Sequence, residues 1–152
     1  MLEMQSSQLT GYIEKLIDLA FIDKEIPVTE KNPLKSKLGR YCFGDNFLPF
    51  AYEDYVKETI MQDPVAYLGF VPLKIGRWWN NKEEIDLVAF DEEQIAFIEC
   101  KWRNQPTGID MLTSLKKKSE LLQSSLKPHY IVFSKSGCTD TLENSEALCH
   151  VI

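Results

Sequence analysis

The sequence predicts an α/β fold in which helices cover a mixed β-sheet. Strand-like runs rich in β-branched and aromatic residues alternate with runs of helical periodicity after residue 48. Three strand-like runs follow one another before a helix intervenes, which predicts a meander followed by a helical crossover. The length of 152 residues fits one main domain with a small appendage.

The small appendage is predicted to comprise residues 1–47. Residues 6–22 have helical spacing, and residues 25–30 and 39–47 read as two strands. The loop between the strands is basic, with Lys31, Lys35, Lys37 and Arg40. This order resembles the second half of a winged helix whose first two helices are missing. A small α/β appendage packed on the main domain is the alternative.

The main domain is predicted to comprise residues 48–152. A helix over residues 48–62 is ended by Asp63 and Pro64. The expected order is then strand, strand, strand, helix, strand, over residues 70–79, 84–90, 95–102, 109–123 and 129–135. A short helix over residues 139–148 and a last strand at residues 149–152 complete the sheet.

Composition excludes several classes of protein. The net charge of −6 argues against a protein that coats nucleic acid through bulk electrostatics. No apolar run is long enough for a membrane helix, and no glycine-rich nucleotide-binding motif occurs. The four cysteines form no CxxC pair, so we expect reduced thiols and a cytoplasmic protein.

The informative stretch is EEIDLVAFDEEQIAFIECKW, residues 83–102. A turn centred between Glu92 and Glu93 pairs residues whose numbers sum to 185, which places Asp86 opposite Glu99 and Glu84 opposite Lys101. Period-2 alternation leaves an apolar opposite face made of Ile85, Leu87, Ala89, Ala96, Ile98 and Cys100.

Two facing carboxylates destabilise a sheet unless a cation accompanies them. A divalent cation such as Mg²⁺ or Mn²⁺ would resolve the conflict, because hard cations prefer oxygen ligands. Lys101 could then stabilise charge that develops on a phosphate. The alternative is an ordinary salt-bridge set, in which Glu84 pairs with Lys101 while Asp86 or Glu99 meets water at the sheet end.

Asp86 followed by Glu99-Cys100-Lys101 on the next strand resembles the PD-(D/E)xK motif of restriction-endonuclease-like nucleases. The resemblance implies a metal held by Asp86, Glu99 and the Cys100 carbonyl, with Lys101 assisting catalysis. It also implies an acid on the preceding helix, for which Glu53 is the candidate and a solvated helix charge the alternative. Ile85 stands where the motif has proline, which weakens the match.

A closer resemblance is to the C-terminal domain of archaeal-type AAA-family ATPases. It lies in GRWW (76–79), EEIDLVAF (83–90), ECKWRNQP (99–106) and LTSLKKKS (112–119), with EIPVTEKNPLKSKLGRY (25–41) resembling the wing. In that family an ATPase domain and a winged helix precede a nuclease-like domain of unknown function. The resemblance implies an ATPase domain as partner, in cis or in trans, and a chain that is part of a longer protein.

Together these features predict a metal-dependent DNA endonuclease with Asp86, Glu99, Lys101 and Glu53 at its site and Glu84 as a weaker accessory. The alternatives are a non-catalytic assembly or regulatory module that keeps the fold, and a DNA-binding adaptor acting through the basic loop. A homodimer is possible. The lysines 116–118 could contact phosphates or form a solvated helix face. Trp78 and Trp79 could stack on bases or anchor a strand end with one ring buried and one at the rim.

Overall fold

The computed structural model describes residues 6–43 and 52–152, which form two compact units. The first contains the described residues up to Ile26 and those from Glu30 to Phe43. The second contains residues 27–29 and 52–152 and holds the main sheet. Each unit is described by itself.

The first unit consists of a helix and a two-stranded antiparallel sheet. Its elements are α1 (Ser6–Asp18), β1 (Ile22–Glu25), the 3₁₀ helix η1 (Pro33–Lys35) and β2 (Arg40–Phe43). Helix α1 ends before the predicted residue 22, and Ala20 just beyond it has a positive φ of 55°.

The predicted strand over residues 25–30 is wrong, because the strand ends at Glu25. The chain then enters the second unit, where the N–H of Val28 donates to the carbonyl of Arg77 at 3.0 Å. Of the predicted second strand, residues 44–47 lie outside the described residues. The identity of this unit as part of a winged helix stays a prediction.

The second unit is a five-stranded mixed sheet with the order β3-β4-β5-β6-β7. The strands are β3 (Lys74–Trp79), β4 (Glu84–Phe90), β5 (Gln94–Lys101), β6 (Lys127–Ser134) and β7 (Leu148–Val151). Strands β3, β4 and β5 form an antiparallel meander, and β6 and β7 continue it in parallel. The predicted α/β class and the strand, strand, strand, helix, strand order are confirmed.

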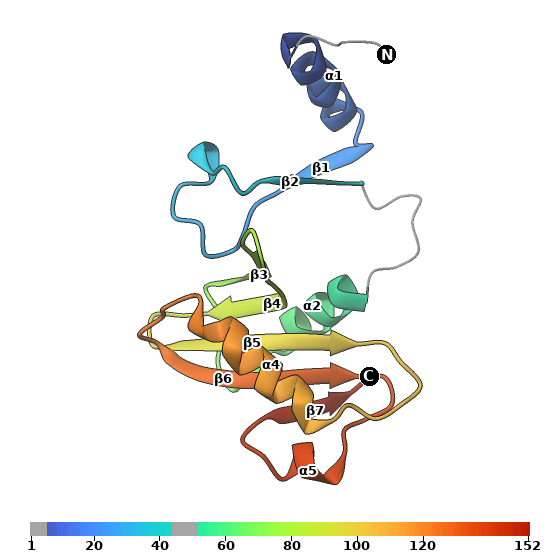
Figure 1. Cartoon of the computed structure of the whole chain (residues 1–152), viewed down its shortest axis with the longest axis vertical. Helices are drawn as coiled ribbons and strands as arrows, with labels where there is room; N and C mark the ends of the chain where they lie inside the picture. Colours follow the sequence, from blue (N-terminus) through green and yellow to red (C-terminus); the bar gives the residue numbers. More distant parts are fainter. Residues whose placement is uncertain (1–5, 44–51) are drawn as a thin grey trace. The chain divides into compact units, whose positions relative to one another are not determined.

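Four helices accompany this sheet: α2 (Tyr52–Gln62), α3 (Pro64–Leu68), α4 (Ile109–Glu120) and α5 (Asp140–Glu143). Helix α4 connects β5 to β6 and crosses one face of the sheet (Figure 1). Its buried Leu115 packs with Val88 and Phe97 of that face. The opposite face packs against α2 and α3, where Ile60 and Leu68 are fully buried.

Asp63 explains a helix that the sequence reading missed. Its side chain accepts a hydrogen bond from the N–H of Ala66 at 3.2 Å, and Pro64 occupies the first turn of α3. Gly69 ends this helix with a φ of 81°, which favours glycine. The two residues that end α2, as predicted, therefore also begin α3.

The β4–β5 turn fixes the register on which the candidate site depends. Asp91 accepts hydrogen bonds from the N–H groups of Glu93 and Gln94 at 2.8 and 2.7 Å. The four described pairs, from Leu87↔Ile98 to Phe90↔Ile95, all have numbers that sum to 185. The predicted register is confirmed for these pairs.

A β-bulge in β4 changes which side chains share a face. Gly76 pairs with Val88 and Trp78 pairs with Ile85, so Asp86 and Leu87 together oppose the single residue Arg77. Ile85 consequently packs with Val88 on the α4 side rather than with Leu87. The prediction that Ile85 belongs to the opposite face is wrong, because strict alternation does not survive a bulge.

Two further expectations need correction. Cys138 and Cys149 form a disulfide, so the expected reduced state holds only for Cys42 and Cys100. Trp78 and Trp79 are both buried, whereas one rim position was expected. Over the ranges that the structure describes, no helix combines the length and the apolar character that crossing a membrane requires.

The packing predicts a contrast between two leucines. Leu87 is 1% exposed in the core under α2, so Leu87→Ala should lower the free energy of unfolding by about 2–5 kcal/mol. Leu73 is 68% exposed, so Leu73→Ala should change it by less than about 0.5 kcal/mol. Urea denaturation of both variants measures the difference, and equal losses would contradict this assignment of the core.

Candidate active site

The site forms where the backbone ladder between β4 and β5 ends. The last described pair is Leu87↔Ile98. Beyond it, Oδ2 of Asp86 accepts the hydrogen bond of the Cys100 N–H at 2.8 Å. A side chain thus takes the place of a strand carbonyl. On its other side β5 still pairs with β6, with Lys101 opposite Ser134.

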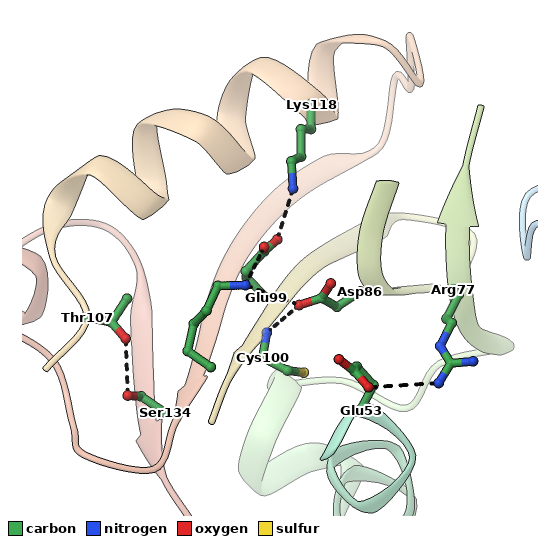
Figure 2. A network of polar contacts seen from close by, with 9 residues as sticks. Glu53, Arg77, Asp86, Glu99, Cys100, Thr107, Lys118 and Ser134 are labelled. Carbon is green, nitrogen blue, oxygen red and sulfur yellow. Dashed lines mark hydrogen bonds and ion pairs between the residues drawn. The ribbon is translucent and has the colours of Figure 1, made fainter. Parts of the chain in front are cut away.

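Glu99 is the buried charge of the site. Its residue is only 4% exposed, on the central strand of the sheet. Lys101 Nζ lies 2.7 Å from Oε1 of Glu99, and Lys118 Nζ, from α4, lies 3.5 Å from Oε2 (Figure 2). A buried carboxylate needs such partners to compensate its desolvation, and these two lysines supply them.

Asp86 completes the cluster. Its Oδ2 lies 3.6 Å from Lys101 Nζ. Burial and the charge of Glu99 raise the pKa of the Asp86 carboxyl, and they outweigh the Cys100 N–H and the charges of Lys101 and Lys118, which lower it. Burial lowers the pKa of Lys101. The hydrogen bond to Glu99 and the charges of Asp86 and Glu99 raise it by more than burial lowers it, so the net shift is upward.

Two carboxylates and two ammonium groups therefore balance one another. The divalent cation expected to make Asp86 and Glu99 compatible is not required for that purpose, because Lys101 and Lys118 already offset their charges. The alternative salt-bridge set differs from the structure as well. Lys101 contacts Glu99 and Asp86, and Glu99 is buried instead of meeting water.

Two predicted acids make none of these ion pairs. Of the two, Glu53 lies beside the cluster, and its charge acts on the Cys100 thiol (Figure 2). Glu84 is exposed at the start of β4, where its backbone pairs with Trp79, and the described ladder between β4 and β5 stops before it. Glu53, on α2, has Oε2 3.9 Å from Nη2 of Arg77. Within residues 6–43 and 52–152, no group of three or more His, Cys, Asp or Glu side chains lies close enough to hold a metal ion between its members.

Cys100 contributes its backbone to the site and its thiol to the core. The side chain is buried among the residues under α2. Burial, followed by the charges of Asp86 and Glu53, raises the pKa of the thiol, so it is neutral. The N–H and C=O of one strand residue point to the same neighbour, so the Cys100 carbonyl is directed toward β4, where its N–H meets Asp86.

The sequence analysis did not predict the contacts of Lys118 and Arg77. Lys118 follows the buried Leu115 by three residues, which places it beside the sheet-facing stripe of α4, and this spacing could have indicated its contact with Glu99. Arg77 lies opposite the bulge and contacts Asp54 at 3.3 Å. No pattern in the sequence indicates that bulge.

With the fold and the site in view, comparison with known proteins assigns a family. Residues 20–120, about two thirds of the chain, match the sequence profile of DUF234, described as archaeal and bacterial proteins of unknown function. The chain belongs to this family. The DUF234 match includes the meander, Asp86, Glu99, Lys101 and Lys118.

Two individual proteins are similar to this DUF234 chain. An uncharacterized protein of Methanocaldococcus jannaschii is 36% identical over 138 residues, an alignment that covers 68% of this chain and 31% of the relative. The chain thus spans about a third of the length of that relative. The crystal structure of a repair endonuclease from Pyrococcus abyssi gives a TM-score of 0.47 at 16% identity, covering 74% of this chain and 51% of that one. Neither similarity assigns a reaction to this chain.

The raised pKa of Asp86 predicts how Asp86→Asn changes stability with pH. A carboxyl whose folded-state pKa lies above its unfolded value makes stability fall as pH rises between the two values. At neutral pH the ionised Asp86 therefore destabilises the fold. Asn can still accept the Cys100 N–H, so Asp86→Asn should unfold at higher denaturant concentration than the wild type at neutral pH.

The higher stability of Asp86→Asn should disappear as pH falls below the ordinary Asp pKa. The wild-type Asp86 carboxyl is then protonated in both the folded and the unfolded state. Denaturant titrations at several pH values measure it. A loss of stability in Asp86→Asn at neutral pH would mean that the ion pair with Lys101 outweighs burial.

Proposed function

We propose that this chain carries a nuclease-like domain whose acidic site binds a divalent cation and hydrolyses phosphodiester bonds of DNA. The observation that carries the proposal is the buried Glu99 beside Asp86 at the open end of the β4–β5 ladder, with Lys101 in contact with both carboxylates. The PD-(D/E)xK pattern on these two strands supports the same reaction.

The donor set fits a hard cation. Asp86 and Glu99 supply carboxylate oxygens, and the Cys100 carbonyl faces the same gap. Among the described residues no hydrogen bond reaches Oδ1 of Asp86, so this oxygen is available as a ligand. Mg²⁺ is commonly held by one or two carboxylates with water and phosphate oxygens in its other positions, so two acids suffice.

The lysines have separate tasks in the proposed reaction. Asp86 and Glu99 would hold a Mg²⁺ or Mn²⁺ ion, which would supply Lewis-acid activation of a phosphate oxygen and of a water molecule. Lys101 lies against both carboxylates and is placed to stabilise negative charge on the phosphate during attack. Lys118 contacts Glu99 from α4 and orients its carboxylate. Glu53 stays a candidate supporting acid on the α2 side, close to Arg77.

The setting proposed for this activity follows the sequence resemblance. DNA is the proposed substrate, and an ATPase domain, in cis or in trans, is the proposed partner in the cytoplasm. A homodimer is part of the same proposal. The chain aligns with 31% of the length of its M. jannaschii relative, so the activity of a whole protein of that length is part of this proposal.

A non-catalytic assembly or regulatory module is the second candidate. The favouring observation is that the ammonium groups of Lys101 and Lys118 offset the charges of Asp86 and Glu99. A module that keeps this network as a structural element needs no metal. The two candidates therefore differ in cation binding before they differ in DNA cleavage.

Isothermal titration calorimetry with Mg²⁺ and Mn²⁺ separates them. The nuclease proposal expects saturable binding to the wild type and binding at least about tenfold weaker in Asp86→Ala. Glu84→Ala, two residues away on the same strand and exposed, is the matched control and should bind as the wild type. No binding to the wild type above that of Asp86→Ala would favour the module.

Lys101→Met extends the test to chemistry. This variant should retain cation binding and lose cleavage of a labelled DNA duplex by about 10²–10³-fold, because charge stabilisation is removed while the carboxylates remain. Wild-type cleavage that survives Lys101→Met unchanged would remove Lys101 from the proposed mechanism.

A further inference from the structure

A pocket of about 310 Å³ lies between the β3–β4 turn and α4. Its walls are Asn80, Lys82 and Glu83 from the turn, and Ser114, Lys117, Lys118 and Leu121 from the helix. Three of these seven side chains are lysines and one is acidic, in a chain whose net charge is −6. The pocket is therefore a local basic surface on an acidic protein.

Lys118 connects this pocket to the acidic site. It lines the pocket, and its ammonium group lies 3.5 Å from Oε2 of Glu99. Figure 2 shows Lys118 reaching from α4 toward Glu99. The pocket and the acidic site are therefore separated by the single side chain of Lys118. A nucleic-acid backbone bound in the pocket would lie next to Asp86 and Glu99.

The turn that forms the other wall is held in place. Oδ1 of Asn80 accepts hydrogen bonds from the N–H groups of Lys82 and Glu83 at 2.7 and 2.9 Å. The N–H of Asn80 in turn donates to the carbonyl of Glu83 at 2.9 Å. These bonds fix the backbone of the turn from which Lys82 extends.

The lysines 116–118 are not equivalent. Lys116 pairs with Glu146 and lies 5.6 Å from the ring centre of Tyr130, outside the pocket. Lys117 is exposed and lines the pocket. Helix α4 thus presents Lys117 and Lys118 to the pocket and Lys116 to an acidic partner elsewhere, which supplies a control of equal charge.

We propose that this pocket is a phosphate subsite that holds the DNA backbone next to the acidic site, with Lys82 and Lys117 as its contacts and Lys118 shared between pocket and site. Ser114 and Asn80 supply further polar groups, and Leu121 supplies an apolar wall for a sugar. The inference rests on the proposed nuclease function for its choice of ligand. The negative charge of Glu83 repels phosphate and limits the affinity of the pocket for DNA.

Fluorescence anisotropy with a short labelled DNA duplex, in EDTA so that no cleavage occurs, tests the subsite. The double variant Lys82→Ala, Lys117→Ala should bind at least about tenfold more weakly at low salt, and the slope of log K against log salt should fall by about 0.9 for each lost contact. Glu83→Gln should bind more tightly than the wild type, because it removes the opposing charge.

Lys116→Ala is the matched control and should bind DNA as the wild type does. Circular dichroism of each variant checks that the fold is kept. A wild type without measurable DNA binding would overturn the inference, and so would a double variant that binds like the wild type or like Lys116→Ala. The same series with single-stranded DNA shows which form the pocket prefers.

The outcomes separate this inference from the nuclease proposal. DNA binding that depends on Lys82 and Lys117, together with no cation binding and no cleavage, would support the subsite and reject the nuclease. Cation binding and cleavage that are unchanged in the double variant would support the nuclease and reject the subsite.

Discussion

Burial of the Glu99 carboxylate on the central strand is the constraint around which the second unit is arranged. A charged group that is 4% exposed must be surrounded by cations or donors. Lys101 supplies one ammonium group from the same strand, and Lys118 supplies the other from the crossover helix. The position of α4 over β5 is therefore an electrostatic requirement as well as a packing one.

The backbone of β4 determines the position of Asp86, the second acid of the site. The bulge in β4 sets Asp86 and Leu87 against Arg77, and the β4–β5 ladder ends directly beside it. Asp86 then takes the Cys100 N–H through its side chain. The fold thus keeps Asp86 where burial and a neighbouring charge raise its pKa. An acid retained in surroundings that disfavour its ionised form is typical of functional sites, which exchange stability for chemistry.

Much of this arrangement could be predicted from the sequence, because it follows from local patterns. Alternation and the Asp91 turn were sufficient to predict the register that brings the Asp86 and Glu99 region together. The disulfide and the α3 helix depend on contacts that spacing alone does not indicate.

The error at Ile85 has a different cause. A bulge inserts one extra residue into a strand and reverses the faces of the residues beyond it, which an alternating pattern of residues does not indicate. Lys118 was missed as a partner of Glu99 because its contact spans 19 residues of sequence. Without that contact, the sequence showed only Lys101 as a positive charge beside the two carboxylates, and a divalent cation was predicted to balance them.

The central claim is that the Asp86–Glu99 pair is a cation site now balanced by lysines. Anomalous diffraction from crystals soaked in Mn²⁺ tests it most directly. We expect a peak bonded to carboxylate oxygens of Asp86 and Glu99 and to the Cys100 carbonyl, with Lys101 displaced from at least one of them. Well-ordered side chains that keep the Lys101 and Lys118 contacts, with no peak between the carboxylates, would contradict the account.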